Sequence, residues 1–218
     1  MSLTIYWGSG SPVSWRALLA LALKKMPYES HQLKLSEKEH RSEEYLALSP
    51  RGTFPILCDG KHVVRESLAI LNYLEVLQPE RPLLGTTPPE VGEIWRHIGE
   101  QESYLGSAVQ EVTRAFFRKA GVQDADALTK ALETVRKELS LLEEAWTTSD
   151  WLVGTSPTAA DIVYYPTVHR LLRAASKSVA QEHGLSATPL KNYPAIAEWL
   201  ERMRSQPGVD ETYPPHWR

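Results

Sequence analysis

The chain has 218 residues, of which 42% are hydrophobic and 23% charged, and its formal net charge is −3. This composition is typical of a globular protein with one large or two small domains, and it excludes a disordered or fibrous chain. Acidic and basic residues are interspersed, so we expect no nucleic-acid partner. The N-terminal residues lack a charged and then apolar leader, and no apolar run reaches the ~18 residues that span a bilayer, so we expect a cytoplasmic protein without a membrane partner.

The first 77 residues alternate apolar runs of strand length with helix-like runs, which is typical of an α/β domain. A strand at 3–6, a helix at 14–24 and a strand at 30–35 predict a βαβ unit. A helix at 42–48 follows. Asp59-Gly60 then separates two short apolar runs, 55–58 and 63–64, and predicts a hairpin. A helix at 67–77 completes this domain.

A Pro- and Gly-rich stretch, QPERPLLGTTPP at 78–89, cannot continue a helix and is the predicted linker. Beyond it, the apolar spacing predicts helices at 90–119, 124–147, 158–175 and 193–204, so residues 90–218 form an all-helical domain. The third of these helices begins with Thr158-Ala-Ala-Asp161, which is a capping box. We therefore expect Asp161 to have a structural role.

The single cysteine, Cys58, follows Ile56-Leu57 in a predicted strand. One cysteine cannot form an internal disulfide or a cysteine-rich zinc site, and we expect no metal. The apolar surroundings favour a buried strand thiol, and a reactive nucleophile is the alternative.

This order of elements, together with four motifs, resembles the cytosolic glutathione S-transferase family. ALSPRGTFPIL resembles the family's stretch that ends in a cis-proline, and VVRESLAILNYLE resembles its Glu-Ser pair before an apolar helix. GTSPTAADIVYYP and NYPAIAEWLERMRSQPGV resemble the capped central helix and the final helix of its second domain. The resemblance covers residues 3 to about 209. It implies a thioredoxin-like α/β domain at 1–77 that binds glutathione, an all-α acceptor-substrate domain at 90–218, and a homodimer.

Within the family, SPVSWRALLALAL resembles the zeta class, in which a serine stands five residues before the arginine of Ser-Trp-Arg. Ser11 and Arg16 have this spacing, which also resembles the tau class. Two positions depart from the zeta pattern, because Pro12 stands in place of a serine and Val13 in place of a cysteine.

Ser11 is the predicted catalytic residue. A free thiol has a pKa of about 8.5, so a glutathione transferase must stabilise the thiolate at neutral pH. A hydroxyl that donates to sulfur at a helix N-terminus does this. Three alternatives stay open: Ser9 as the donor, Tyr6 as the donor, or a serine (Ser11 or Ser14) that only caps the helix.

The resemblance also implies the glutathione-binding residues. The Phe54–Pro55 peptide is expected to be cis and to turn the Phe54 backbone toward the cysteinyl part of glutathione. Glu66 would hold the γ-glutamyl ammonium and Ser67 its carboxylate, and the alternative is a simple N-cap pair. His40 stands fifteen residues before Pro55, where it would reach the glycine end or be an ordinary solvated residue.

Arg173 stands twelve residues after Asp161, at a position that resembles a zeta arginine for the substrate carboxylate. It would otherwise be a solvated arginine. The predicted function is therefore that of a glutathione transferase, which conjugates glutathione to an electrophile or isomerises a maleyl acid. The alternative is a non-catalytic relative that binds or regulates. A thiol oxidoreductase of the omega type is disfavoured, because that class carries a cysteine where Ser11 stands.

Overall fold

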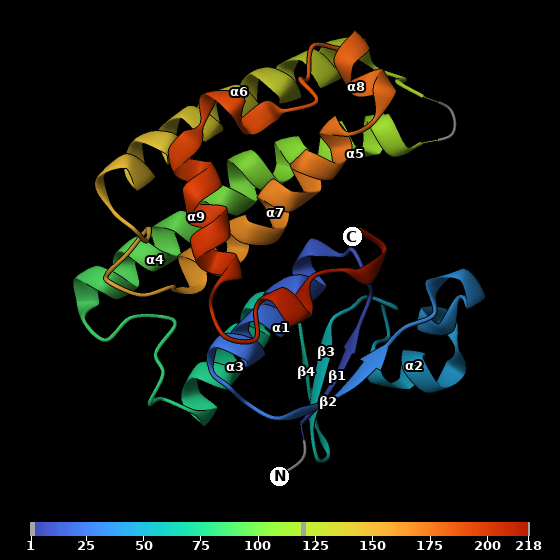
Figure 1. The fold of residues 1–218 in the computed structure, drawn as a ribbon. Helices are drawn as coiled ribbons and strands as arrows, with labels where there is room; N and C mark the ends of the chain where they lie inside the picture. Colours follow the sequence, from blue (N-terminus) through green and yellow to red (C-terminus); the bar gives the residue numbers. More distant parts are fainter. Residues whose placement is uncertain (1–2, 119–120, 218) are drawn as a thin grey trace. The chain divides into compact units, whose positions relative to one another are not determined.

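The computed structural model describes residues 3–118 and 121–217. The chain forms two compact units, one ending at Leu84 and joined by the segment from Ser205 onward, and the other spanning Gly85–Arg204 (Figure 1). The first unit therefore consists of two separate stretches of the sequence.

The first unit contains a mixed four-stranded sheet in the order β2-β1-β3-β4. β1 is parallel to β2 and antiparallel to β3, and β3 is antiparallel to β4. The elements are β1 (Leu3–Trp7), α1 (Pro12–Leu23), β2 (Tyr28–Gln32), short 3-10 turns at Leu35–Glu37 and Glu39–Arg41, α2 (Glu43–Leu48), β3 (Ile56–Asp59), β4 (His62–Arg65) and α3 (Ser67–Leu77). This is the expected thioredoxin-like arrangement.

The second strand begins and ends earlier than the predicted range of 30–35. β2 is an edge strand whose side chains after Tyr28 are exposed, so it shows no alternation of buried and exposed residues. Its bounds are set by pairing with β1, in which Leu3 lies opposite Tyr28. Leu33 follows the strand and is buried, which is why the apolar pattern extends past its end.

Two faces of the sheet have separate cores. Ile5 and Leu57 are fully buried on one face, and α3 packs against β3, β4 and α1. On the other face, Tyr45 of α2 packs with Leu33 and Ile56.

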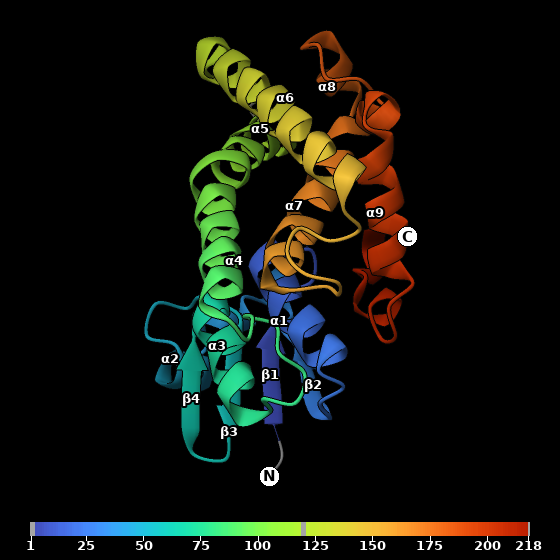
Figure 2. The same ribbon diagram turned by 90° about the vertical axis from the view of Figure 1, so that its left-hand side faces the viewer.

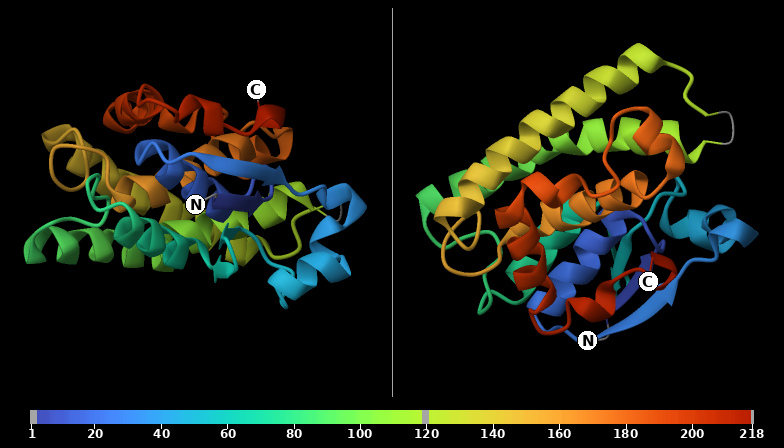
Figure 3. Two further views of the ribbon diagram at one scale, coloured as in Figure 1. Left: turned by 90° about the horizontal axis from the view of Figure 1, so that it is seen from below. Right: turned by 45° about the horizontal axis from the view of Figure 1, so that its top comes forward.

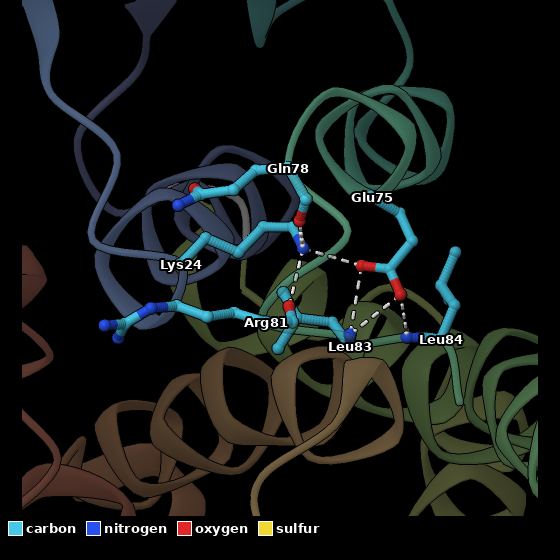
Figure 4. Close-up of polar contacts among 6 residues, drawn as sticks. All are labelled: Lys24, Glu75, Gln78, Arg81, Leu83 and Leu84. Atoms are coloured by element: carbon cyan, nitrogen blue, oxygen red, sulfur yellow. Dashed lines mark hydrogen bonds and ion pairs between the residues drawn. The ribbon is translucent and has the colours of Figure 1, made fainter. Parts of the chain in front are cut away.

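A buried lysine fixes the segment that follows α3 (Figure 4). The Lys24 ammonium, which is fully buried, lies 2.8 Å from Glu75 Oε2 and donates to the carbonyl oxygens of Gln78 and Arg81 at 2.8 and 2.6 Å. Glu75 in turn accepts hydrogen bonds from the backbone N–H groups of Leu83 and Leu84. Because a buried charge requires full pairing, this cluster holds residues 78–84 to the ends of α1 and α3.

The C-terminal residues return to the first unit. Thr212, in a 3-10 turn at Asp210–Thr212, accepts a hydrogen bond from Trp15 Nε1 at 2.7 Å. The rings of Tyr213 and Trp217 meet the Trp15 ring edge-on, with centroid separations of 5.3 and 5.8 Å. The sequence pattern did not predict this return, because no periodicity distinguishes residues 205–217 from the end of a helical domain.

The second unit is helical, as expected. Its elements are α4 (Pro88–Glu100), a π-helix (Gln101–Gly106), α5 (Ser107–Phe117), α6 (Ala125–Thr148), α7 (Ala159–Ala175), α8 (Ser178–Glu182), a 3-10 turn (Pro189–Asn192) and α9 (Pro194–Arg204). The long α6 packs on α5 and α9, and α7 packs on α4 and α5 (Figure 3).

The predicted helix at 90–119 is not one regular helix. Its end, Lys119, lies outside the described residues, and the π-helix separates α4 from α5, where the chain turns in Figure 2. Gln101 is fully buried and donates to Thr167 Oγ1 at 2.9 Å. A Cβ atom on Gly106 would lie 2.6 Å from Gln101 Nε2, so glycine there makes room for the buried amide.

The start of α7 confirms the predicted capping box. Asp161 is fully buried and accepts hydrogen bonds from Thr158 N, Leu152 N and Trp199 Nε1 at 3.0, 3.4 and 3.0 Å. Burial raises the pKa of Asp161 to about 6 despite these hydrogen bonds. The carboxyl group joins three segments of the unit, which is a structural role.

Candidate functional site

The sheet register brings three predicted segments to one end of the first unit. In the antiparallel pairs, Tyr6 lies opposite Ile56, and Ile56 lies opposite Arg65. Residues that follow β1, precede β3 and follow β4 must therefore lie at the same edge of the sheet. These are the loop at 8–11, the Phe54–Pro55 peptide and the start of α3.

Ser11 is the N-cap residue of α1. Its Oγ accepts a hydrogen bond from Ser14 N at 3.4 Å. A serine hydroxyl can accept and donate at the same time, so the capping bond leaves the Ser11 hydrogen available for another acceptor. The buried Ser14 hydroxyl accepts from Gly8 N at 3.2 Å, which ties the loop to the helix. The cap and the thiolate donor are thus compatible roles for one side chain.

Phe54 lies between the loop and His40. A Cβ atom on Gly8 would lie 2.5 Å from Phe54 Cε2, so only glycine allows this close approach. The Phe54–Pro55 peptide is cis, as expected. The His40 ring lies edge-on to Phe54 at 6.0 Å between centroids, and its buried Nδ1 has no hydrogen-bond partner among the described residues. The structure therefore brings His40, Phe54 and the loop together.

The start of α3 lacks a side-chain cap among the described residues. Glu66, before the helix, has φ of 69° and ψ of 125°, a conformation that non-glycine residues rarely adopt. Ser67, the first helical residue, is only 6% exposed. The first N–H groups of a helix have no intrahelical partners and carry partial positive charge. This helix start can therefore bind a carboxylate.

Two alternative donors have other partners. The Ser9 hydroxyl lies 3.0 Å from His216 Nδ1 and forms a hydrogen bond with it. Tyr6 packs against the core cluster around Tyr45, with the two ring centroids 6.1 Å apart, and burial raises its pKa. Sequence reasoning assigned no role to His216, and the only available sign was the aromatic run at 213–217.

Cys58 is half-buried on β3. Burial raises the pKa of its thiol, and Arg65 opposes this shift. A raised pKa keeps the sulfur protonated and weakly nucleophilic. The Cys58 thiol therefore fits the prediction of a structural thiol in a strand better than that of a reactive nucleophile.

Arg173 belongs to the second unit, in the last turn of α7. Its guanidinium carbon lies 5.8 Å from the centre of the Phe117 ring. The other predicted site residues all belong to the first unit. No group of three or more His, Cys, Asp or Glu side chains suited to a metal occurs within 3–118 and 121–217, and no described helix is long and apolar enough to span a membrane.

A thioredoxin-like sheet unit followed by a helical unit defines the class of protein, and comparisons with known proteins identify the family. The model of the glutathione S-transferase N-terminal domain matches residues 1–76, and that of the C-terminal domain matches residues 125–202. The crystal structure of a glutathione S-transferase from the Antarctic clam Laternula elliptica is 30% identical, with a TM-score of 0.83 and coverage of 100% of this chain and 94% of the other.

Two curated relatives add to this result. Glutathione S-transferase A of Pleuronectes platessa is 26% identical over 99% of this chain and 92% of its own length. Maleylacetoacetate isomerase of Dictyostelium discoideum is 42% identical over only 81 residues, 36% of each chain. The chain belongs to the glutathione S-transferase family.

Proposed function

We propose that the protein is a glutathione transferase in which Ser11 donates a hydrogen bond to the glutathione thiolate. The observation that carries the proposal is the position of Ser11, at the start of α1 and with its hydroxyl hydrogen uncommitted among the described residues. Its competitor Ser9 already forms a hydrogen bond with His216. A donor to the charged form of sulfur lowers the thiol pKa, and so does the partial positive charge of the helix N-terminus.

The remaining residues of the cluster would hold the tripeptide. Ser67 and the uncapped N–H groups of α3 suit the γ-glutamyl carboxylate, and Glu66 suits its ammonium. His40 would donate from its unpaired Nδ1 to the glycine carboxylate. The Phe54 backbone would contact the cysteinyl part between these ends. We assign glutathione binding to residues 1–77, the linker to 78–89, and acceptor binding to the helical residues that follow.

The bound thiolate would attack an electrophilic carbon of the acceptor, forming a carbon–sulfur bond. In conjugation, a leaving group departs or the acceptor takes up a proton. In isomerisation of a maleyl acid, the adduct rotates about its central bond and then expels the thiolate. Conjugation is the broader proposal, because the maleylacetoacetate isomerase relative matches only 36% of the chain.

We also propose a homodimer, since Val76 on α3 is 77% exposed beside a hollow of about 570 Å³ that β4 and α3 line.

Substitution of Ser11 tests the proposal. We expect Ser11→Ala to lower kcat by about 10²-fold while the glutathione Kd from calorimetry changes little, because the lost hydrogen bond acts on the charged sulfur. Ser9→Ala is the matched variant, and a loss from it alone would assign the role to Ser9. Folded protein that binds no glutathione at millimolar concentration would contradict the proposal. Binding without turnover on electrophiles or maleyl acids would indicate the non-catalytic alternative.

A further inference from the structure

The C-terminal segment lies against the loop that carries Ser11. A Cβ atom on Gly10 would lie 3.0 Å from His216 Nε2 and 3.2 Å from Trp217 Nε1, so both rings rest on the Gly10 backbone. His216 Nδ1 also forms a hydrogen bond with Ser9 Oγ at 3.0 Å. One imidazole therefore holds the two residues that immediately precede Ser11.

The segment is itself anchored to the helix that Ser11 caps. Thr212 accepts a hydrogen bond from Trp15 Nε1, and the Trp217 ring packs edge-on against Trp15. Trp15 is 2% exposed and fixed within α1, so it provides a rigid base for the turn that presents His216. The position of His216 is thus set by α1, the same helix that Ser11 caps.

The two glycines of the loop, Gly8 and Gly10, allow the close contacts with neighbouring rings and also make the loop depend on those contacts. Gly8 meets the Phe54 ring and Gly10, with φ of +78°, meets His216, so the loop is held between two rings. A loop with two glycines has many accessible conformations and loses much entropy when it is ordered. Contacts from outside the loop must therefore select the conformation that directs the Ser11 hydroxyl.

We propose that His216 is a positioning residue for Ser11: by bonding Ser9 and covering Gly10, it holds the loop in the conformation in which the Ser11 hydroxyl meets the glutathione sulfur. This inference rests on the proposed function of Ser11. A hydrogen bond to a thiolate depends on a few tenths of an ångström, so a displaced loop weakens it without removing the tripeptide's other contacts. Loss of His216 should therefore raise the pKa of the bound thiol and lower kcat more than it changes KM.

Three variants test the proposal, read by the ultraviolet absorbance of the bound thiolate against pH and by steady-state kinetics. His216→Ala should raise the pKa of bound glutathione toward that of the free thiol and lower kcat by about tenfold, with KM for glutathione nearly unchanged. His216→Asn should stay near wild type, because its side-chain amide can replace the ring Nδ1 as the partner of Ser9. Ser9→Ala removes the same bond from the loop side but keeps the ring over Gly10, so it should give a smaller change in the same direction, with no further loss when it is added to His216→Ala.

Glu211→Ala provides the matched control, since Glu211 is an exposed residue of the same segment and should leave the thiol pKa unchanged. A normal thiol pKa and kcat in both His216→Ala and Ser9→Ala, with Ser11→Ala impaired, would overturn this inference and leave the proposed function intact. A normal thiol pKa in Ser11→Ala would instead overturn the proposed function. Reduced stability with an unchanged thiol pKa would also overturn the positioning role, and Ser9→Ala gives this answer if His216→Ala fails to fold.

Discussion

Three helix starts in this molecule differ in how their first N–H groups are satisfied. α4 and α7 both begin with a capping box, formed by Thr87 with Glu90 and by Thr158 with Asp161. α3 begins after Glu66 without a side-chain cap among the described residues. The two capped starts, here called closed, belong to helices of the helical unit. The uncapped start of α3, here called open, lies in the cluster of predicted glutathione-binding residues. The first N–H groups of α3 therefore have no side-chain acceptor among the described residues, unlike those of α4 and α7.

The two closed starts also differ from each other. Asp161 is fully buried, and burial raises its pKa to about 6. Glu90 is only partly buried, and hydrogen bonds donated by Thr86 and Thr87 lower its pKa. The same motif is thus a buried junction in one helix and a surface feature in the other.

The largest expected effect is the loss of the buried cap. Asp161→Ala should lower the free energy of unfolding by about 4 kcal/mol, because it leaves the buried Thr158 N and Trp199 Nε1 and the part-buried Leu152 N without their acceptor. Urea unfolding followed by circular dichroism measures this. Glu90→Ala is the matched control and should cost much less, since water replaces its acceptor. Equal losses in the two variants would contradict the distinction between the caps.

The pH dependence of stability should have opposite signs at these caps. The folded-state pKa of Asp161 is raised from 3.8 to about 6, so the folded chain retains a proton that the unfolded chain has released. This contribution to stability is complete below pH 4 and is lost, by at most about 3 kcal/mol, as the pH rises through 6. The lowered pKa of Glu90 stabilises above its ordinary pKa, and this contribution is lost on acidification.

Unfolding free energies of wild type, Asp161→Asn and Glu90→Gln between about pH 2.5 and 7 isolate each group by difference. The curve for Asp161→Asn should lack the fall with rising pH, and the curve for Glu90→Gln should be less sensitive to acid. A wild-type curve parallel to that of Asp161→Asn would exclude a raised pKa at Asp161.

The far end of α7 offers a test of substrate class. If Arg173 contacts the acceptor, Arg173→Met should weaken use of an acidic acceptor by about 2 kcal/mol in kcat/KM and leave a neutral electrophile nearly unaffected, because methionine retains the apolar stem but lacks the charge. The measurement compares a maleyl acid with a neutral electrophile. Equal losses would assign Arg173 to the fold, through its contact with Phe117.

The smallest expected effect concerns the open start of α3. Ser67→Ala should weaken glutathione binding by about tenfold, or about 1.4 kcal/mol, since it removes one hydrogen bond to a carboxylate but keeps the backbone N–H groups. Calorimetry measures the change. Ser42→Ala is the control, because Ser42 caps α2 by accepting from Tyr45 N and should affect stability without affecting affinity. An unchanged Kd for Ser67→Ala would contradict the assignment of this helix start.

Local signals predicted the parts of the fold that depend on local chemistry. The Asp59-Gly60 turn and the Asp161 capping box each combine a few neighbouring residues, and the structure has both. The cis peptide before Pro55 was implied by the family resemblance, and the structure has it too. The features that escaped prediction depend on distant partners. The π-helix requires Gln101 to reach Thr167, and the hydrogen bond between Ser9 and His216 joins residues 207 positions apart. Such contacts leave no periodicity in the sequence.

The candidate site divides in the same way. The family resemblance named Ser11, Phe54 and Ser67, and the strand register of the structure places the segments that carry them at one edge of the sheet. The prediction for Arg173 was based on its spacing from Asp161 within one helix. A spacing gives the distance along the helix but not the residues that the side chain faces. His216 was missed, because the aromatic run at 213–217 does not show which residues it contacts.

The return of residues 205–217 to the first unit has a consequence for biosynthesis. On the ribosome, Trp15 and the Ser11 loop emerge long before Thr212 and His216, with the whole helical unit translated between them. Until that later segment emerges, the sheet can form but Trp15 lacks its hydrogen-bond acceptor and Gly10 lacks its cover. A nascent chain would therefore form the sheet first and order the loop that carries Ser11 last, after the whole helical unit has been made.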